Sequence, residues 1–383
     1  MLLAAALLFA ALRGARAALP GVHTAMAFAC NATWSYAHNS GWAATPAGRI
    51  AVVLQASQSS EGAASQRLFI AFSADGGATF APPAVLAGNG SAAVWGPVIV
   101  ADGAALRVFY AQAPAAAPTA LCGDLLTTAS LDDGASWGPP ELVLPMAAWG
   151  GGVKCPDNKP VRIAPDRWAL PFFSSNAIPG QRGLAASGLV AARAGAGLAG
   201  PFELLAGSIP SPDAAPSYYP EPAIASCGGA RGRLLALLRN YEFTWASASA
   251  DGGASWAPLA PTNLTNPFSK VDLAQWQGAT ARGPQPGALL LAHNPVASCP
   301  AHSYCPRTPL GVSWTQDCGA SWAPPLLIEP VNGSMAFGYP TVAACGARRV
   351  CVSYTVDDNA KKPFNSVGIR FASFDADLLL PSA

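Results

Sequence analysis

A carboxylate and a guanidinium lie at the two ends of one predicted hairpin. Glu221 precedes the apolar run AIAS, Arg239 ends the run RLLALLR, and the Gly-rich segment CGGAR between them is typical of a turn. Both charged residues are nine positions from Ala230, so we expect them to be cross-strand neighbours at the end of the hairpin away from its turn. Because the chain has so few charges, this placement predicts a functional pair. The alternative is a plain cross-strand ion pair.

Four copies of one short pattern predict the elements that position this pair. Each copy reads Ser/Thr-x-Asp-x-Gly-x-Ser/Thr-aromatic, and we call the copies Asp-boxes: Ser73–Phe80, Ser130–Trp137, Ser249–Trp256 and Thr315–Trp322. Each follows an alternating apolar run typical of a strand. The Asp can accept hydrogen bonds from backbone N–H groups, the Gly accepts positive φ, and the aromatic ring buries area beside the turn. We interpret these Asp residues as turn staples rather than catalytic or metal-binding groups, since catalysis rarely needs four copies.

The spacing of the Asp-boxes predicts the architecture. Their first residues are 57, 119 and 66 positions apart, so the long gap holds about two periods. We therefore expect one degenerate copy near LVAARAGAGLAGPFE, Leu189–Glu203. A period near 60 allows about six units of four short strands in residues 18–383, and nothing reads as a long amphipathic helix. The sequence predicts an all-β fold, a single six-bladed β-propeller with Asp-box turns.

The topology of such a blade predicts one face for the chemistry. The Asp-box joins the third strand to the fourth, so the starts of first strands, the ends of second strands and the second-to-third loops should share the opposite face. That face should then gather the Glu221–Arg239 pair with four other residues: Tyr339 in GYPTVAACGARRVCVSYT, Arg307 in RTPLGVSWTQD, Glu61 in QASQSSEGAASQ and His38 in AHNSGW.

These segments, together with the Asp-boxes, resemble the sialidase (neuraminidase) superfamily of six-bladed propellers over most of the chain. EPAIASCGGARGRLLALLRN is similar to the family's Glu-Pro hairpin that ends in an Arg. HNPVASCPAHSYCPRTPLGVSWTQDCGASW is similar to the segment that carries another Arg just before an Asp-box, and GYPTVAACGARRVCVSYT to the segment of the nucleophilic Tyr. NKPVRIAPDRWALPF and NLTNPFSKVDLAQ resemble the divergent BNR-repeat branch.

The resemblance implies a role for each matching residue. Tyr339 matches the nucleophile, Glu221 the carboxylate that takes its proton, and Arg239 and Arg307 two of the three arginines that clamp the carboxylate of the sugar. Glu61 lies twelve residues before the first Asp-box serine, where the family usually has an Asp acid/base. The family's first arginine is missing: AHNSGW occupies its place, with His38 the nearest candidate. Further substrate-binding candidates are Asn158 and Lys159 in DNKP and Asn266 in TNPFS.

These residue types suit the hydrolysis of an acidic sugar. A sugar that carries a carboxylate repels a carboxylate nucleophile, whereas a neutral Tyr avoids the repulsion but needs a base. Arg meets a carboxylate with two parallel hydrogen bonds. We predict a sialidase-like exo-glycosidase that acts with retention on terminal sialic acid or a related acidic sugar. The missing arginine leaves two alternatives: a hydrolase of a different sugar, or a non-catalytic carbohydrate-binding propeller. In each case a glycan is the expected partner.

The composition speaks against other classes of partner. The net charge is +1, only 11% of residues are charged, and no long basic run occurs, so nothing indicates nucleic acid. The four His residues are scattered and no Cys-x-x-Cys occurs, so we predict no metal site. No Gly-rich phosphate loop follows a strand at the required spacing, and no cofactor is expected.

The N-terminal segment predicts secretion. MLLAAALLFAALRGARA, residues 1–17, has an apolar stretch too short to span a bilayer, followed by the small-x-small pattern ARA, so we read a signal peptide whose removal leaves Ala18 first. No later segment has membrane-spanning length, so no membrane insertion is expected. The alternative for this segment is a buried N-terminal helix.

Cysteines and sequons agree with an extracellular or secretory-pathway location. Nine Cys residues fit an oxidising compartment, with Cys345–Cys351 and Cys299–Cys305 as plausible local bridges, and their odd number leaves at least one thiol unpaired or intermolecular. Four sequons permit glycosylation, at Asn31, Asn89, Asn263 and Asn332.

Overall fold

The computed structural model describes residues 19–148, 152–176, 184–205, 209, 221–227, 232–241, 243–278, 280, 283–296, 306–360 and 365–380. The predicted signal peptide, residues 1–17, and the predicted Cys299–Cys305 bridge lie outside these ranges.

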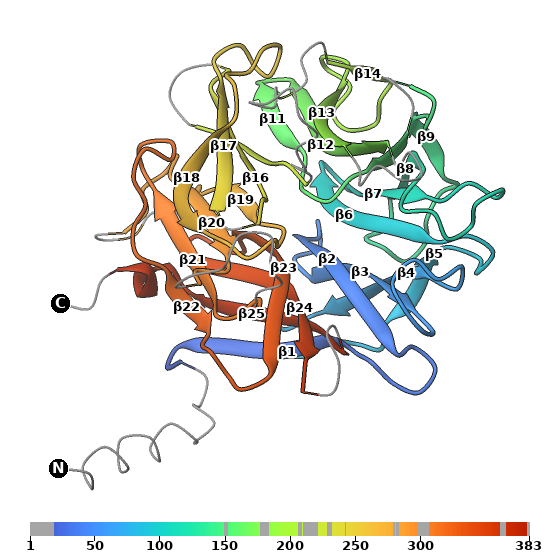
Figure 1. Ribbon diagram of the computed structural model, residues 1–383, viewed down its shortest axis with the longest axis horizontal. Helices are drawn as coiled ribbons and strands as arrows, with labels where there is room; N and C mark the ends of the chain where they lie inside the picture. The colour runs from blue at the N-terminus through green and yellow to red at the C-terminus, as the bar shows by residue number, and fades with distance from the viewer. Residues whose placement is uncertain are drawn as a thin grey trace, which may run out of the picture.

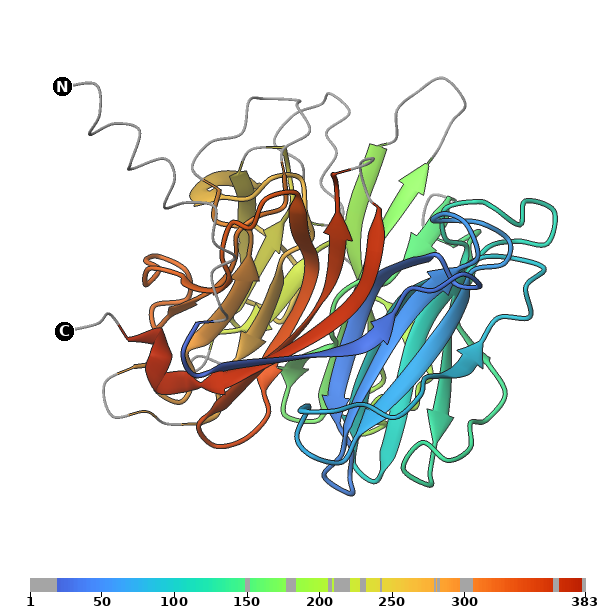
Figure 2. The same cartoon turned by 90° about the horizontal axis from the view of Figure 1, so that it is seen from below.

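Six antiparallel sheets follow one another around a central axis, and the predicted six-bladed propeller is confirmed (Figure 1). Each blade runs from an inner to an outer strand, and Figure 2 shows the strands extending between the two faces. Blade 1 is β2 (Tyr36–Ala44), β3 (Ile50–Ser57), β4 (Arg67–Ser73) and β5 (Ala84–Ala87); blade 2 is β6 (Val94–Asp102), β7 (Ala105–Gln112), β8 (Asp124–Ser130) and β9 (Glu141–Leu144). Blade 3 is β10 (Val153–Cys155) and β11 (Val161–Ala164), which both pair with β12 (Arg167–Asn176), then β13 (Leu184–Ala192) and β14 (Phe202–Leu204).

The other three blades follow the same order. Blade 4 is β15 (Ala223–Ser226), β16 (Leu234–Leu238), β17 (Phe243–Ser249) and β18 (Ala260–Thr265); blade 5 is β19 (Asp272–Gln275), β20 (Leu289–His293), β21 (Leu310–Thr315) and β22 (Leu326–Glu329). Blade 6 is β23 (Met335–Ala344), β24 (Arg349–Asp358), β25 (Ser366–Asp375) and, as its outer strand, β1 (Val22–Ala29) from the other end of the chain. A 3-10 turn, η1 (Ala376–Leu379), follows β25.

The hydrophobic core lies between blades rather than within one sheet. Successive side chains of a strand point to opposite faces, and here both faces are covered by neighbouring blades. In β3, Ile50, Val52 and Leu54 pack toward blade 6, whereas Ala51 and Val53 pack toward blade 2. Each of the six blade interfaces holds one such apolar cluster. Continuous apolar runs such as AVVL and LLALL therefore form strands here, because both of their faces are buried.

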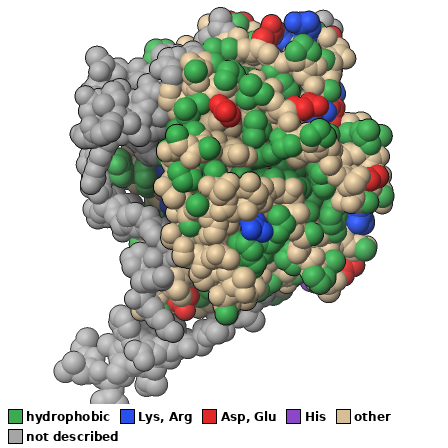
Figure 3. Space-filling model, turned by 90° about the vertical axis from the view of Figure 1, so that its right-hand side faces the viewer, with side chains coloured by type: hydrophobic (Ala, Val, Ile, Leu, Met, Phe, Trp, Pro, Cys, Tyr) green, Lys and Arg blue, Asp and Glu red, His purple; other side chains and the backbone are tan. Residues whose placement is uncertain are grey.

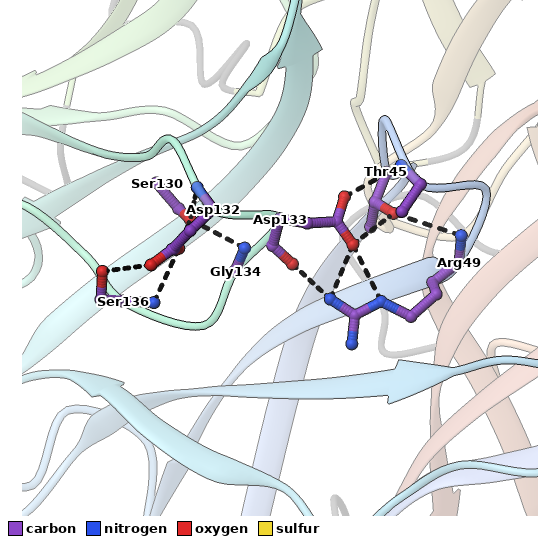
Figure 4. A network of polar contacts seen from close by, with 8 residues as sticks. Thr45, Arg49, Ser130, Asp132, Asp133, Gly134 and Ser136 are labelled. Carbon is purple, nitrogen blue, oxygen red and sulfur yellow. Dashed lines mark hydrogen bonds and ion pairs between the residues drawn. The ribbon is translucent and has the colours of Figure 1, made fainter.

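The Asp-boxes are turn staples, as predicted (Figure 4). In the second box, Asp132 accepts hydrogen bonds from the N–H and the hydroxyl of Ser136, while the Ser130 hydroxyl accepts from the Gly134 N–H at 2.7 Å. Hydrogen bonds from Ser136 and Ser130 lower the pKa of Asp132 to about 2. The other three boxes repeat this network.

The expected degenerate copy, Leu189–Glu203, does contain the connection from β13 to β14 in blade 3. This turn has no Asp of its own. Instead, Asp102 of blade 2 accepts a hydrogen bond from the Leu198 N–H at 2.8 Å.

Three disulfides join described residues. The predicted local bridge Cys345–Cys351 is confirmed, and Cys122–Cys155 and Cys227–Cys318 join neighbouring blades. Cys30 is unpaired.

The surface carries few charges. On the side shown in Figure 3, Lys, Arg, Asp and Glu side chains are scattered rather than grouped. The sequon residues are all exposed: Asn31, Asn89, Asn263 and Asn332. Among the described residues, no helix has the length and hydropathy needed to cross a membrane.

Candidate active site

A bulge in β23 turns Tyr339 toward the central axis. The register of β23 against β24 shifts between Gly338 and Thr341, and Tyr339 has φ +54°, a value that only a few per cent of non-glycine residues adopt. The strand begins at Met335, four residues earlier than expected, so Tyr339 lies at a bulge within the strand rather than at its start. Backbone strain of this kind persists only where the surrounding structure holds the residue in place, and it is common at functional sites.

Glu221 has the same backbone conformation one step before β15. Its φ is +62°, and Pro222 follows it, just as Pro340 follows Tyr339. Asn158 donates a hydrogen bond from Nδ2 to the main-chain oxygen of Glu221 at 3.2 Å, which fixes this turn. Arg239 directly follows β16, whose residue Leu237 pairs with Ala223. Continuing that register places Arg239 across from Glu221, as the sequence predicts.

Tyr339, Glu221 and Arg239 form one buried hydrogen-bonded cluster. The Tyr339 hydroxyl donates to Glu221 Oε1 at 2.7 Å, and it accepts a hydrogen bond from Arg239 Nη1. Arg239 Nη1 also lies 2.8 Å from Glu221 Oε2. The phenol therefore has an acceptor for its proton on one side and a positive charge beside its oxygen on the other.

Burial keeps the phenol neutral. Removal from water raises the pKa of Tyr339 well above its ordinary value, and the charge of Glu221 raises it further, whereas Arg239 acts in the opposite direction. The ground state is thus a neutral Tyr next to a carboxylate that can take its proton. The guanidinium would stabilise the phenolate once the proton moves.

Glu61 lies in the loop between β3 and β4, at the mouth of the same pocket. The residue keeps access to solvent, while its carboxyl lines the pocket and accepts a hydrogen bond from Gln55 Nε2 at 3.3 Å. The pKa of Glu61 is raised to about 6, chiefly by desolvation of the carboxyl. The charge of Arg307 acts in the opposite direction, and the charge of Glu221 adds to the rise. A carboxyl with this pKa can donate and accept a proton near neutral pH.

These groups surround a pocket of about 290 Å³ on the central axis. Its wall is drawn from blades 1, 2, 3, 4 and 6, and consists of Asn39, Gln55, Glu61, Trp95, Gly96, Leu121, Cys122, Asp157, Phe173, Glu221, Arg239 and Tyr339. Four of the predicted site residues are therefore on the wall: Tyr339, Glu221, Arg239 and Glu61. Arg239 is the one cation of this wall as the described residues form it.

His38 and Arg307 contact the ring of Tyr339 without reaching the wall. The His38 ring lies 4.1 Å from that of Tyr339, and Arg307 Cζ lies 5.0 Å from the Tyr339 ring centroid. Arg307 also donates a hydrogen bond to the Phe268 carbonyl at 3.1 Å. Burial, and then the charges of Arg307, Arg239 and Lys270, hold the pKa of His38 well below its ordinary value. His38 is thus a neutral ring and does not supply the charge of a missing arginine.

The structure does not bring Lys159 and Asn266 to this pocket. Lys159 forms an ion pair with Asp272, donates to the Val342 carbonyl at 2.9 Å, and lines a different pocket. Asn266 is fully buried; it donates to the Ser269 carbonyl and accepts from the Asn294 N–H. Both residues hold the fold together where a substrate contact had been expected.

The structure adds wall residues that sequence reasoning missed, chiefly Asp157, Asn39 and Gly96. A signal for one of them was present: Gly96-Pro97 repeats the pattern of Glu221-Pro222 and Tyr339-Pro340, a residue of positive φ before a proline at an inner strand. Asn39, with φ +45°, holds the equivalent place in β2 without a proline. No comparable signal marks Asp157, which reaches the pocket from the segment between β10 and β11.

Comparison with known proteins agrees with this architecture. A BNR repeat-like domain family matches residues 218–352, which include Glu221, Arg239, Arg307 and Tyr339. The fold of the chain is that of solved sialidase structures. The intramolecular trans-sialidase of Ruminococcus gnavus superposes on this chain with a TM-score of 0.73 and 11% identity, over 97% of this chain and 100% of that one.

Two further solved structures superpose on the chain in the same way. The leech intramolecular trans-sialidase gives a TM-score of 0.71 and 12% identity over 94% of this chain and 71% of that one. A Hadza microbial sialidase gives 0.67 and 13% over 91% and 67%. No curated protein matches the chain. At such identities the likeness shows the fold alone.

Proposed function

We propose that this six-bladed propeller is a secreted exo-glycosidase that removes terminal sialic acid or a related acidic sugar with retention of configuration. The observation that carries the proposal is the Tyr339 hydroxyl held between an acceptor carboxylate, Glu221, and a guanidinium, Arg239. A neutral phenol with a base at 2.7 Å is the arrangement that a Tyr nucleophile requires. The three disulfides and the exposed sequons support an oxidising, secretory environment.

The proposed reaction has two steps. In the first, the Tyr339 oxygen bonds to the anomeric carbon while its proton passes to Glu221, and Glu61 gives a proton to the leaving glycosidic oxygen. In the second, Glu61 takes a proton from water, the water oxygen bonds to the anomeric carbon, and Tyr339 leaves and recovers its proton from Glu221. Two displacements on one carbon retain its configuration. Arg239 stabilises the negative charge that develops on the phenol oxygen.

Substitution of the nucleophile tests the proposal. Tyr339→Phe removes one oxygen and leaves the buried ring, so the protein should fold while turnover of a fluorogenic α-sialoside falls by about 10³-fold or more. Hydrolysis rates of wild type and variant, with thermal melting as the folding control, give the answer. Turnover that survives in the folded variant would contradict the assignment.

A second candidate, a hydrolase of a different sugar, is favoured by the charges on the wall. As the described residues form it, the wall carries the carboxyls of Glu61, Asp157 and Glu221 but a single guanidinium, that of Arg239. An anionic sugar would have few cations to meet in this pocket, because each lost charge-assisted hydrogen bond forgoes about 1.5–3 kcal/mol. A panel of fluorogenic glycosides separates the two candidates: Tyr339-dependent turnover confined to uncharged sugars would select the second.

A further inference from the structure

Asn39 and Asp157 form a part of the pocket wall that the proposed reaction does not use. Asn39 lies at a bulge in β2, where the register shifts between His38 and Ser40, and its N–H donates to Thr355 Oγ1 at 3.1 Å. This contact and the φ of +45° direct its side chain to the axis. Asn39 Nδ2 then donates to Asp157 Oδ1 at 2.5 Å.

Asp157 is held in place on several sides. Two residues before it, Cys155 is bonded to Cys122 of blade 2. A Cβ on Gly96 would lie 1.9 Å from the Pro156 carbonyl oxygen, so the first strand of blade 2 packs directly against this segment. Lys270 Nζ donates to the main-chain oxygen of Asp157 at 2.8 Å. The carboxyl therefore reaches the pocket from a rigid support.

Two polar atoms of this wall lack hydrogen-bond partners among the described residues. Asn39 Oδ1 and Trp95 Nε1 are both buried, and neither has a hydrogen-bond partner among the described residues. Asn39 is 3% exposed and Trp95 is 7% exposed, and both line the pocket. Buried polar atoms are nearly always paired with protein or water, so the unpaired acceptor on this pocket wall is open to a ligand that donates a hydrogen bond.

The acceptors on the wall restrict what that ligand group can be. Asn39 Oδ1 is an acceptor without a partner among the described residues, and Asp157 Oδ1 accepts from Asn39 Nδ2. Burial, and then the charge of Glu221, raises the pKa of Asp157, whereas Lys270 and Arg239 lower it. A carboxylate has lone pairs but no hydrogen to donate to Asn39 Oδ1, whereas a hydroxyl group can donate one.

We propose that Asn39 and Asp157 bind a neutral, hydrogen-bond-donating edge of the sugar, a hydroxyl group, and keep a carboxylate away from this wall. The carboxylate of an acidic sugar then faces Arg239. The inference deepens the proposed function and takes from it only that the ligand is a sugar.

A matched pair of probes tests this assignment. N-Acetylneuraminic acid and its methyl ester share every hydroxyl group and differ in charge, and calorimetric titration gives the dissociation constant of each. Because both probes present the same hydroxyl groups to the wall, Asp157→Ala should weaken the binding of both by about 10-fold, which corresponds to the loss of one hydrogen bond. Asn39→Ala should do the same, and the double variant should lose little beyond either single one, since the two side chains act as a unit.

Asp166→Ala serves as the matched control, because Asp166 is exposed in the turn between β11 and β12 and is not part of the pocket. Melting curves verify that each variant is folded. Weakened binding of the acid alone would make this wall the carboxylate site and overturn the inference. Unchanged binding of both probes, or no binding of either by the wild-type protein, would overturn it too. Tyr339-dependent turnover of a sialoside is a separate readout, so either proposal can fail while the other stands.

Discussion

At the scale of single residues, two carboxyl groups of the pocket differ in their contacts. Glu221 is hydrogen-bonded to Tyr339 and paired with Arg239, whereas Glu61 has neither contact and a pKa of about 6. Groups whose environments differ in this way can act as base and acid within one reaction. Glu221 suits the role of accepting a proton from Tyr339, and Glu61 that of donating one to the leaving oxygen.

The pKa of Glu61 predicts the alkaline limb of the pH profile. A general acid must be protonated, so kcat should fall as the pH rises through about 6. Glu61→Gln should remove this limb and lower kcat by roughly 10²-fold for a glycoside with a poor leaving group. Rates from pH 4 to 9 for both proteins measure this. If the same limb persists in Glu61→Gln, another group is the acid.

At the scale of elements, three of the blades are joined to the next one through their first hairpin turn. The turn between β2 and β3 carries Arg49, whose guanidinium reaches Asp133 in the Asp-box of blade 2 at 2.7 Å (Figure 4). The turn after β15 carries Cys227, bonded to Cys318 in the Asp-box of blade 5. Asp102, at the first hairpin turn of blade 2, accepts a hydrogen bond from the Leu198 N–H of blade 3. The chemistry changes from one junction to the next, but the position in the blade does not.

The inner strands also pack closely against neighbouring blades, as Gly96 does against blade 3. Gly96 has φ +59°, and a Cβ there would overlap the Pro156 carbonyl; Gly103 has φ +63° and open space around it. Gly103→Ala should therefore cost only the left-handed backbone term of about 1–2 kcal/mol. Gly96→Ala should cost this backbone term and more, because the added methyl group would also have to push blade 2 away from blade 3.

We thus expect Gly96→Ala to lower the free energy of unfolding clearly more than Gly103→Ala, and to weaken glycan binding because Asp157 lies against Gly96. Chemical denaturation of the two variants beside the wild type measures the first effect, and titration with N-acetylneuraminic acid the second. Equal destabilisation by the two substitutions would show that the blades tolerate the added methyl group.

At the scale of the whole molecule, the ring closes through one non-local strand pair. β1 pairs with β25, with Val22 opposite Phe374, so the two ends of the described chain share blade 6. Six apolar interfaces then surround the axis without an open end. This closure brings residues 38, 61, 221, 239, 307 and 339 into one region.

The Asp-boxes predict how the whole molecule responds to acid. Their hydrogen bonds lower the pKa of Asp132, Asp251 and Asp317 to about 2, against an ordinary value of 3.8. A depressed pKa contributes stability that is present above the unfolded value and lost as the pH falls through the folded one. The melting temperature should therefore drop between about pH 4 and pH 2.

Asn at the three Asp-box positions should flatten this drop, because the amide does not titrate. Melting curves from pH 5 to 2 compare the triple variant with the wild type. Glu61 and Asp357 do not affect this comparison, because their pKa values are raised to about 6. Their ionisation changes the stability above about pH 4, and there it lowers the stability as the pH rises. An equally steep drop in the triple variant would assign the acid response to other groups.

The sequence by itself determined the repeat and therefore the fold. The Asp-boxes are local turns, so their hydrogen bonds connect residues only two to four positions apart and leave a pattern that can be read directly. The Glu221–Arg239 register was equally local, since it follows from counting along one hairpin. The period then gave six blades, and the blade topology gave the face on which the two residues lie.

Only the tertiary structure decided which side chains share the pocket. Asp157 and Asn39 meet across blades 1 and 3, Lys159 turns to Asp272, and β1 closes the ring with β25, all through contacts between residues far apart in the chain. Backbone conformation within a strand was equally hidden, since the bulge at Tyr339 depends on its pairing with β24. Local patterns encode turns and periods, whereas the direction of a side chain at the hub depends on how neighbouring blades pack.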